Sequence, residues 1–347
     1  MKLYLHIGTE KTGSSYLQSV AAINRAYLKE KGIHFPTAGK REKQLLNGEI
    51  SAGNAQPLAD AIKAGNRQEV IQLLHEHLAD AQAKKCQRVL LSNEMLLLAL
   101  SQEDKVAKFQ HSIREAGFTS AHYLLILRDP VDQALSLYKH RAKSGTAADI
   151  EEWVSEHYHY GDGLYNFLQQ AKACDLPLSC RKYSHQLDEL FFNEWLGLAT
   201  ASLQKPGKRV NPSLSISELL LIRQLRQQNP VLPELLYRTF LQLPRNFKAQ
   251  EPRIKSYYKA VLGNELNLYH KTWKTCNLHL PKDTPLSLAE HKAIEPNKVM
   301  TFSAQQGEAI AGLMHQLCSP VFLLKLTLIR YKRKLGRLLR ALRPNAS

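Results

Sequence analysis

The chain has 347 residues and a formal net charge of +16, from 47 Lys and Arg against 31 Asp and Glu. This length is sufficient to bury a full hydrophobic core in one large domain or two small ones, and the basic excess favours anionic partners. The sequence has no basic stripe with interleaved aromatic residues and no nucleic-acid reader motif, so nucleic acid is not an expected partner.

Cysteine usage and hydropathy bound the cellular environment. The five cysteines are odd in number and form no CxxC pair, which argues against a disulfide framework or a zinc site. No secretory signal precedes the first expected strand, and no apolar run is long enough to span a bilayer. These features predict a reduced, cytoplasmic chain.

The first patterned segment joins a strand, a glycine-bounded loop and a helix. Apolar, β-favouring residues cover 2–7, and apolar residues recur at helical spacing over 13–31. At such a junction backbone N–H groups and the helix dipole point at one spot, and hydroxyl side chains add donors for an anion. The predicted phosphate-binding residues are Gly8, Thr9, Lys11, Thr12, Gly13, Ser14 and Ser15.

The position of the lysine distinguishes this loop from a Walker A loop, which ends in Gly-Lys-Ser/Thr. Here Ser14 follows Gly13, and Lys11 precedes it by two residues. Lys11 is therefore expected on the loop crest, near the outer phosphate or the group attached to it. The stretch HIGTEKTGSSYLQ resembles the 5′-phosphosulfate-binding loop of sulfotransferases that use 3′-phosphoadenosine 5′-phosphosulfate (PAPS), in particular the bacterial ones.

The next elements lead to a candidate general base. Residues 32–66 have little periodicity and are expected to form a substrate-side excursion, and a helix is expected over 68–83. A strand at 88–92 is followed by Glu94, which is placed beside the phosphate loop if the two strands are parallel neighbours. Glu94 is the first candidate for the base that accepts the acceptor's proton.

Other assignments stay open at this position. Glu94 can instead stabilise the dipole of a helix over 95–100. Cytosolic sulfotransferases carry a histidine after the equivalent strand, where this chain has SNE. His34 and His140 are the alternative candidates for the base.

A second motif follows a helix expected over 103–116. A buried strand over 123–127 ends in Arg128, and Pro130 is a favourable first helical residue. Ligands bind at this end of strands in open α/β sheets. The pattern R-D-P-x5-S-x-Y resembles the sulfotransferase segment that holds the 3′-phosphate of PAPS, which implies that role for Arg128 and Ser136. From the residues alone, two other roles fit equally well: Arg128 pairs with Asp129 or caps a backbone carbonyl, and Ser136 is a buried small residue.

The following region supplies the rest of the expected site. Polar and aromatic residues over 144–163 are expected to line the acceptor cleft or act as a lid, before a helix at 164–174 and a strand at 178–183 that leads into a helix through Trp195. The segment KPGKRVNPSLS at 205–215 resembles a family loop that folds over the 3′-phosphate and adenosine. It is otherwise interpreted as a solvated loop. Its candidate ligand residues are Lys208, Arg209, Asn211 and Ser213.

The last part of the chain is expected to be helical. Residues 216–317 show no pattern that indicates chemistry, whereas 318–347 form a basic amphipathic pattern with eight cations and no acid. Such a helix suits the anionic cytoplasmic face of a membrane. Docking on the domain or binding of an acidic acceptor are the alternatives.

Together these patterns predict an α/β fold with a central parallel sheet, flanking helices and a helical C-terminal part. The resemblance implies a P-loop NTPase-like sulfotransferase domain over 1–317, with its PAPS-binding core at about 1–215, and no metal. It implies transfer of a sulfuryl group from PAPS to a hydroxyl or amine of an acceptor, with a carbohydrate or glycolipid precursor as the expected substrate. The alternatives are a P-loop kinase, which the missing Gly-Lys-Ser/Thr disfavours, and a membrane-surface scaffold with a decayed nucleotide site.

Overall fold

The computed structural model divides the chain into two compact units, and each is described by itself. The described residues are 1–39, 42–49, 51–143, 149–207, 214–228, 232–243, 251–286 and 300–317. The first unit comprises Met1–Tyr138, Asp149–Asn211 and Val261–Glu290, and the second comprises Lys139–Ala148, Pro212–Ala260 and His291–Ser347. No helix in the described ranges combines the length and apolarity needed to cross a membrane.

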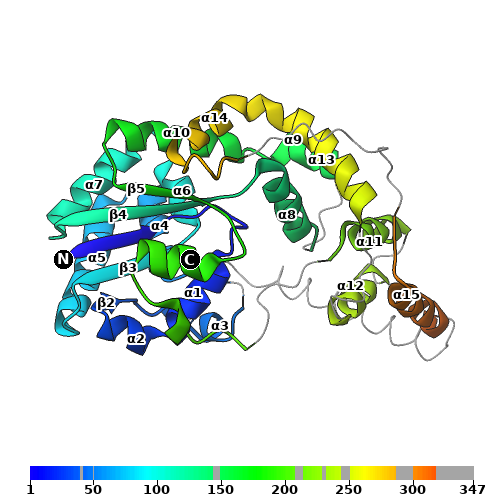
Figure 1. The fold of residues 1–347 in the computed structure, drawn as a ribbon, viewed down its shortest axis with the longest axis horizontal. Coiled ribbons are helices and arrows are strands. Elements are labelled where there is room, and N and C mark those ends of the chain that lie inside the picture. Colours follow the sequence, from blue (N-terminus) through cyan, green and yellow to red (C-terminus); the bar gives the residue numbers. More distant parts are fainter. Residues whose placement is uncertain are drawn as a thin grey trace, which may run out of the picture. The chain divides into compact units, whose positions relative to one another are not determined.

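The first unit is built on a five-stranded sheet with the order β2-β3-β1-β4-β5, in which every pairing is parallel (Figure 1). The strands are β1 (Lys2–His6), β2 (Ile33–His34), β3 (Arg88–Ser92), β4 (Ser120–Leu127) and β5 (Leu178–Lys182). In the register of the sheet, His6 at the end of β1 lies opposite Ser92 of β3 and Leu124 of β4. The segments that follow these three strands therefore leave the sheet at one edge, where open α/β sheets bind ligands.

Helices cover both faces of this sheet. Leu124 and Ile126 of β4 pack in a cluster with Phe191, whereas the hydroxyl of Tyr123 accepts a hydrogen bond from Gln110 on the other face. The helices that lie in the first unit are α1 (Ser14–Ile23), α2 (Arg25–Glu30), α3 (Glu42–Leu46), α4 (Gln56–Ala64), α5 (Arg67–Ala83), α6 (Met95–Leu100), α7 (Lys105–Glu115), α9 (Ile150–His157), α10 (Tyr160–Ala173), the π-helix η2 (Glu189–Trp195), the short 3₁₀ helices η3 (Thr200–Ser202) and η5 (Asn267–Tyr269), and α14 (His270–His279). Helices α8 (Pro130–Lys143) and α13 (Pro252–Leu266) contribute residues to both units. The expected α/β class with a parallel sheet is thus confirmed.

The prediction of a single helix over 13–31 is wrong in one respect. The structure has two helices there, α1 and α2, which are separated at Asn24. The Asn24 amide donates to Val20 O (2.7 Å) and Gln204 O (2.8 Å), and its Oδ1 accepts from Gln204 N–H (2.9 Å). A side chain that bonds to nearby backbone competes with the helical pattern. Asn24 therefore ends α1 and fastens residue 204 to it.

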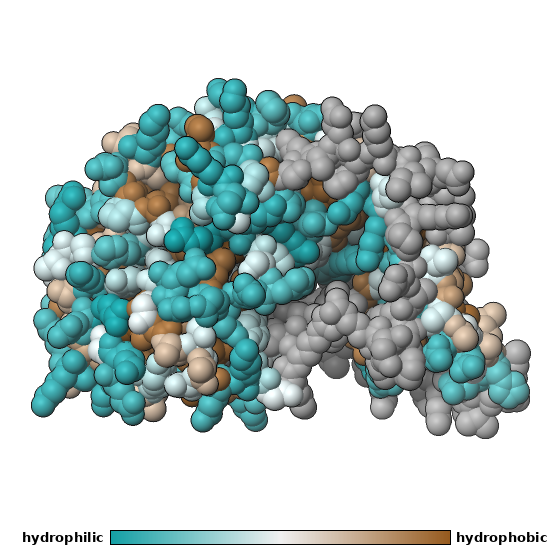
Figure 2. Space-filling view, in the orientation of Figure 1, coloured by the Kyte–Doolittle hydropathy of each residue, from teal (hydrophilic) through white to brown (hydrophobic). Residues whose placement is uncertain are grey.

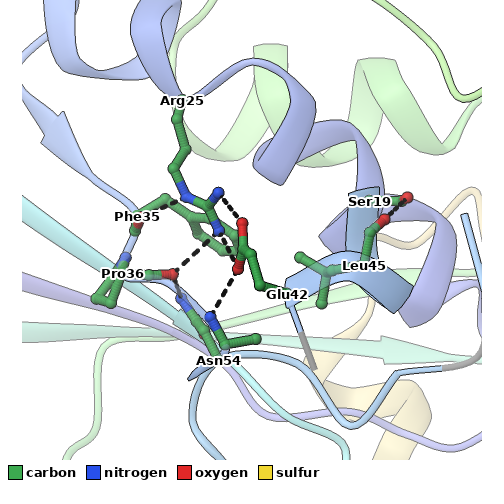
Figure 3. A network of polar contacts seen from close by, with 8 residues as sticks. Ser19, Arg25, Phe35, Pro36, Glu42, Leu45 and Asn54 are labelled. Atoms are coloured by element: carbon green, nitrogen blue, oxygen red, sulfur yellow. Dashed lines mark hydrogen bonds and ion pairs between the residues drawn. The ribbon is translucent and has the colours of Figure 1, made fainter. Parts of the chain in front are cut away.

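The excursion at 32–66 contains more regular structure than its sequence indicates, namely β2, α3 and α4. A polar network holds it against the helices (Figure 3). Arg25 of α2 forms an ion pair with Glu42 and donates to Phe35 O at 3.0 Å. The Asn54 amide donates to Leu90 O of β3 at 3.0 Å. Long-range polar contacts, which periodicity does not reveal, thus order this segment.

The aromatic residues expected to line a cleft or lid have a different place where they are described. Residues 150–157 and 160–173 are helical, and α9 begins with a capping box formed by Asp149 and Glu152. Tyr158, between these helices, is 1% exposed. Its ring therefore belongs to the core of the first unit and does not line an open cleft.

The described part of the second unit is helical, as expected for 216–317. It contains α11 (Ile216–Gln228), α12 (Leu232–Gln242) and α15 (Ala304–Leu317), whose apolar residues share one cluster. The buried Glu251 carboxylate accepts from the N–H groups of Ile216 (2.9 Å) and Ser217 (2.6 Å), which satisfies the N-terminus of α11. The basic tail over 318–347 lies outside the described residues.

Candidate functional site

The loop between β1 and α1 depends on two glycines. Gly8 has φ +110°, and Gly13 has φ +87°. A Cβ atom on Gly8 would lie 3.0 Å from Glu94 O, and one on Gly13 would lie 2.4 Å from a methyl carbon of Leu187. Both positions therefore require glycine for the backbone conformation and for the close packing around it.

The start of α1 supplies hydrogen-bond donors that the described parts of the protein leave unused. The backbone N–H groups of Thr12, Gly13, Ser14 and Ser15 donate to no acceptor among the described residues, as expected for the first turn of a helix. The buried Ser14 Oγ also forms no hydrogen bond of normal geometry there. Four consecutive N–H groups with one hydroxyl suit an anion with several oxygen atoms.

The two threonines of the loop use their hydroxyls internally. Thr9 donates to Ile126 O through both its N–H (3.2 Å) and its Oγ1 (3.0 Å). Thr12 Oγ1 donates to Thr9 O at 2.6 Å. Thr9 thus holds the loop against β4, and Thr12 closes the loop on itself. The part of Thr12 that remains for a ligand is its backbone N–H.

Glu94 lies directly after β3, beside this loop. Its side chain is half-buried and forms no capping hydrogen bond to α6. Burial raises the pKa of Glu94 from 4.5 to about 7, Ser14 and Lys11 favour its ionised form, and the nearby Glu10 opposes ionisation. Glu94 thus interacts electrostatically with two residues of the segment between β1 and α1 and with the first residue of α1.

Arg128, at the end of β4, contacts the crest of the same loop. Its Nη1 donates to Lys11 O at 3.1 Å, and its guanidinium lies 4.9 Å from the centroid of the Tyr183 ring. Asp129 forms an ion pair with Lys182 of β5 at 3.1 Å. The two motifs identified in the sequence therefore meet at the carboxyl edge of the sheet.

Other predicted residues are not brought into this cluster by a contact. Ser136 is half-buried on α8, about 9 Å along the helix axis from Pro130. His34 pairs in the sheet with Val89, about 10 Å before the end of β3. Its Nε2 lies 2.8 Å from Asp80 Oδ2, and its pKa is lowered to about 4 by burial and by Lys84.

Two further assignments lie outside this part of the structure. His140 belongs to the second unit, so it is not placed relative to the loop. The predicted 3′-phosphate residues Lys208, Arg209, Asn211 and Ser213 lie outside the described residues.

Sequence reasoning missed two residues that contact this site. Tyr183 stacks on Arg128, and its place directly after β5 was a usable signal, because that strand ends at the same edge. Gln133 of α8 donates to Glu10 O at 3.3 Å, although it lies 123 residues away in the chain. No pattern in the sequence indicates that contact.

The geometry is therefore that of an anion cradle with a carboxyl group of raised pKa and an arginine at its crest. Comparison of the chain with protein-family models, with curated proteins and with solved structures found no match.

Proposed function

We propose that this protein is a PAPS-dependent sulfotransferase. The observation that carries the proposal is the contact between Arg128 Nη1 and Lys11 O at 3.1 Å. It joins two segments that each resemble a PAPS-binding motif and that lie more than 100 residues apart in the chain. β1 and β4 are parallel neighbours and bring both segments to one edge of the sheet, where open α/β sheets bind ligands. The contact supports the proposal because both segments there carry a pattern that resembles a PAPS-binding motif.

The residues present fit PAPS. The unused N–H groups at the start of α1, with Ser14, Ser15 and Lys11, would hold the 5′-phosphosulfate. Arg128 has further N–H donors beyond the one bonded to Lys11, and with Ser136 it would hold the 3′-phosphate. The loop residues proposed to complete this subsite are Lys208, Arg209, Asn211 and Ser213.

When bound, PAPS supplies an activated sulfuryl group, which an acceptor oxygen or nitrogen takes as the bond to the 5′-phosphate breaks. Lys11 and the N–H groups of the loop would neutralise the charge that develops on the departing phosphate. Glu94 would take the proton of the acceptor hydroxyl or amine. A carboxyl group with a pKa of about 7 is suited to this role, because it is substantially ionised at neutral pH yet basic enough to hold the proton.

The acceptor is proposed from the family resemblance to be a carbohydrate or glycolipid precursor. The cytoplasmic face of a membrane is the proposed location of the reaction.

Calorimetry tests the proposal with three nucleotides: adenosine 3′,5′-bisphosphate, adenosine 5′-monophosphate and ATP with magnesium. We expect the bisphosphate to bind most tightly, and labelled PAPS then to label an acceptor in cell extracts. Preference for ATP with magnesium would indicate a kinase. Binding of none of the three would overturn the proposal in favour of a scaffold.

A further inference from the structure

Two side chains from the β4–α8 segment donate to consecutive backbone carbonyls at the crest of the loop. Gln133 Nε2 donates to Glu10 O at 3.3 Å, and Arg128 Nη1 donates to Lys11 O at 3.1 Å. Both partners are more than 110 residues away in sequence. The crest is therefore held by tertiary contacts in addition to those within the loop.

Other elements fix the orientation of each donor. Gln133 is 2% exposed, and its Oε1 accepts a hydrogen bond from the hydroxyl of Tyr158, which is 1% exposed. This bond assigns the acceptor role to Oε1, so Nε2 faces the loop. Tyr158 O in turn accepts from the Tyr269 hydroxyl at 2.7 Å. The Arg128 guanidinium is held over the ring of Tyr183.

The direction of a held carbonyl determines the direction of the next N–H group. In a trans peptide the C=O of one residue and the N–H of the following residue point in opposite directions. The bond to Glu10 O therefore turns the N–H group of Lys11 away from Gln133, and the bond to Lys11 O turns the N–H group of Thr12 away from Arg128. Lys11 has φ +65°, a conformation that costs a non-glycine residue about 1 kcal/mol or more and needs support from its surroundings.

We propose that Gln133 and Arg128 form a carbonyl clamp that keeps the loop in its anion-binding conformation. A carbonyl oxygen that turned toward a bound phosphate would repel it, and the clamp prevents that rotation. Gln133 is thus a positioning residue that acts through the backbone of Glu10 without contact to the ligand. The inference rests on the proposed function only for the identity of the anion.

The test compares Gln133→Met with Gln110→Met. Both substitutions remove a glutamine that bonds to a tyrosine hydroxyl, but Gln110 lies on α7 and bonds to Tyr123, away from the loop. Binding of adenosine 3′,5′-bisphosphate is measured by calorimetry. We expect Gln133→Met to weaken binding by about 10-fold or more and Gln110→Met to leave it unchanged. Equal effects of the two variants, or no effect of Gln133→Met, would overturn the clamp.

Hydrogen exchange provides a measurement that needs no ligand. The N–H groups of Thr9, Tyr16 and Leu17 are bonded on either side of the crest, so their exchange reports on the loop conformation. We expect faster exchange at all three in Gln133→Met and in the milder Tyr158→Phe, which leaves the amide of Gln133 free to turn. Unchanged exchange in the variants would contradict the inference, whether or not the protein binds a nucleotide. If exchange becomes faster as expected but the wild-type protein binds no nucleotide, only the proposed function is contradicted.

Discussion

The surroundings of Glu94 favour its neutral form, and this preference links function to stability. In the folded protein its pKa is raised from 4.5 to about 7, with burial as the main cause. Between these two pH values the folded state holds more protons than the unfolded state. The stability that the neutral carboxyl contributes is therefore lost as the pH rises from 4.5 to 7.

Glu94→Gln should consequently stabilise the protein at pH 8 and have little effect at pH 4. A pKa shift of this size changes the free energy of unfolding by about 3 kcal/mol. Urea denaturation at both pH values measures this change. In the same variant the turnover number should fall, and the acidic limb of the pH–rate profile near pH 7 should disappear while nucleotide binding is retained.

Glu10→Gln is the matched control, because it removes a neighbouring carboxylate that opposes ionisation of Glu94. It should move the acidic limb to lower pH without abolishing it. A pH–rate profile that both substitutions leave unchanged would exclude Glu94 as the base.

Lys11→Ala should lower the turnover number by about 100-fold or more, because the ammonium group is proposed to stabilise charge that develops in the transition state. The fold should persist, since Lys11 lies on the half-exposed crest. Single-turnover kinetics and circular dichroism measure the two effects. Turnover near that of the wild type in a folded variant would contradict the role.

Ser136→Ala and Arg128→Ala should both reduce the preference for a nucleotide with a 3′-phosphate over its 3′-hydroxyl counterpart. For Arg128 the loss should be on the order of 2–3 kcal/mol, as expected for a charged hydrogen bond to phosphate. Arg128→Ala should also weaken binding of the 3′-hydroxyl nucleotide, because it removes the hydrogen bond to Lys11 O. Ser136→Ala should leave binding of that nucleotide unchanged. Calorimetry with both nucleotides separates these effects, and an unchanged preference in both variants would refute the 3′-phosphate assignment.

At the scale of elements, β1 and β3 are joined behind the loop by a buried polar network. Ser92 Oγ lies 2.8 Å from His6 Nδ1 and accepts from Gln18 Nε2 of α1 at 3.1 Å. Burial lowers the pKa of His6 to about 3, so its ring is neutral at physiological pH. Each side chain comes from a different element, so the network fixes the start of α1 relative to the ends of both strands.

Ser92→Ala should destabilise the protein by about 1–3 kcal/mol. It removes the hydroxyl partner of the buried His6 Nδ1 and leaves Gln18 Nε2 with its 3.5 Å bond to Ser92 O. Urea denaturation measures the loss. Ser101→Ala is the control and should change stability little. Among the described residues the Ser101 hydroxyl bonds only to Leu98 O, three residues earlier in the chain. Equal stability of the two variants would argue against the network.

The elements that were predictable are those with uninterrupted apolar runs. The strands β1, β3 and β4 are largely buried, and each contains an apolar run of three to five residues. β2 has only two residues, and the break at Asn24 depends on a bond to residue 204. The helix expected through Trp195 is present as a π-helix, a distinction that apolar periodicity does not make.

The same contrast applies to the candidate site. The meeting of the loop, Glu94 and Arg128 was predictable, because parallel strands end at one edge of a sheet. The inward hydroxyls of Thr9 and Thr12 and the contact of Gln133 with Glu10 O were not predictable. They depend on side-chain directions and on pairings between distant segments, for which a single sequence contains no periodic signal.

At the scale of the whole molecule, the formal net charge of +16 is unevenly distributed. The face of the first unit drawn in Figure 2 is mostly hydrophilic, with scattered apolar residues, whereas the last 28 residues of the chain contain eight cations and no acid. The predicted amphipathic helix over 318–347 would therefore provide half of the net charge in one segment. Membrane association is expected to depend on that segment.

Deletion of 321–347 should abolish sedimentation with anionic vesicles, because each cation near an anionic surface contributes about 1 kcal/mol. Neutral vesicles should bind neither protein, and high salt should weaken binding of the full chain. Deletion of only 345–347, which removes no cation, is the control. If the full-length protein does not sediment with anionic vesicles at low salt, the segment 318–347 has another role.

The first unit is discontinuous in sequence, which constrains how it can form during synthesis. All five strands have been translated by Lys182, but α14 also belongs to this unit. Thr272 of α14 donates to Gly161 O at 3.2 Å, and Trp273 and Cys276 beside it are buried. A nascent chain of 215 residues would therefore emerge from the ribosome with α10 lacking its cover. The face of α10 that α14 covers therefore stays open while residues 212–260 of the second unit are made, which gives chaperones a period in which to act on it.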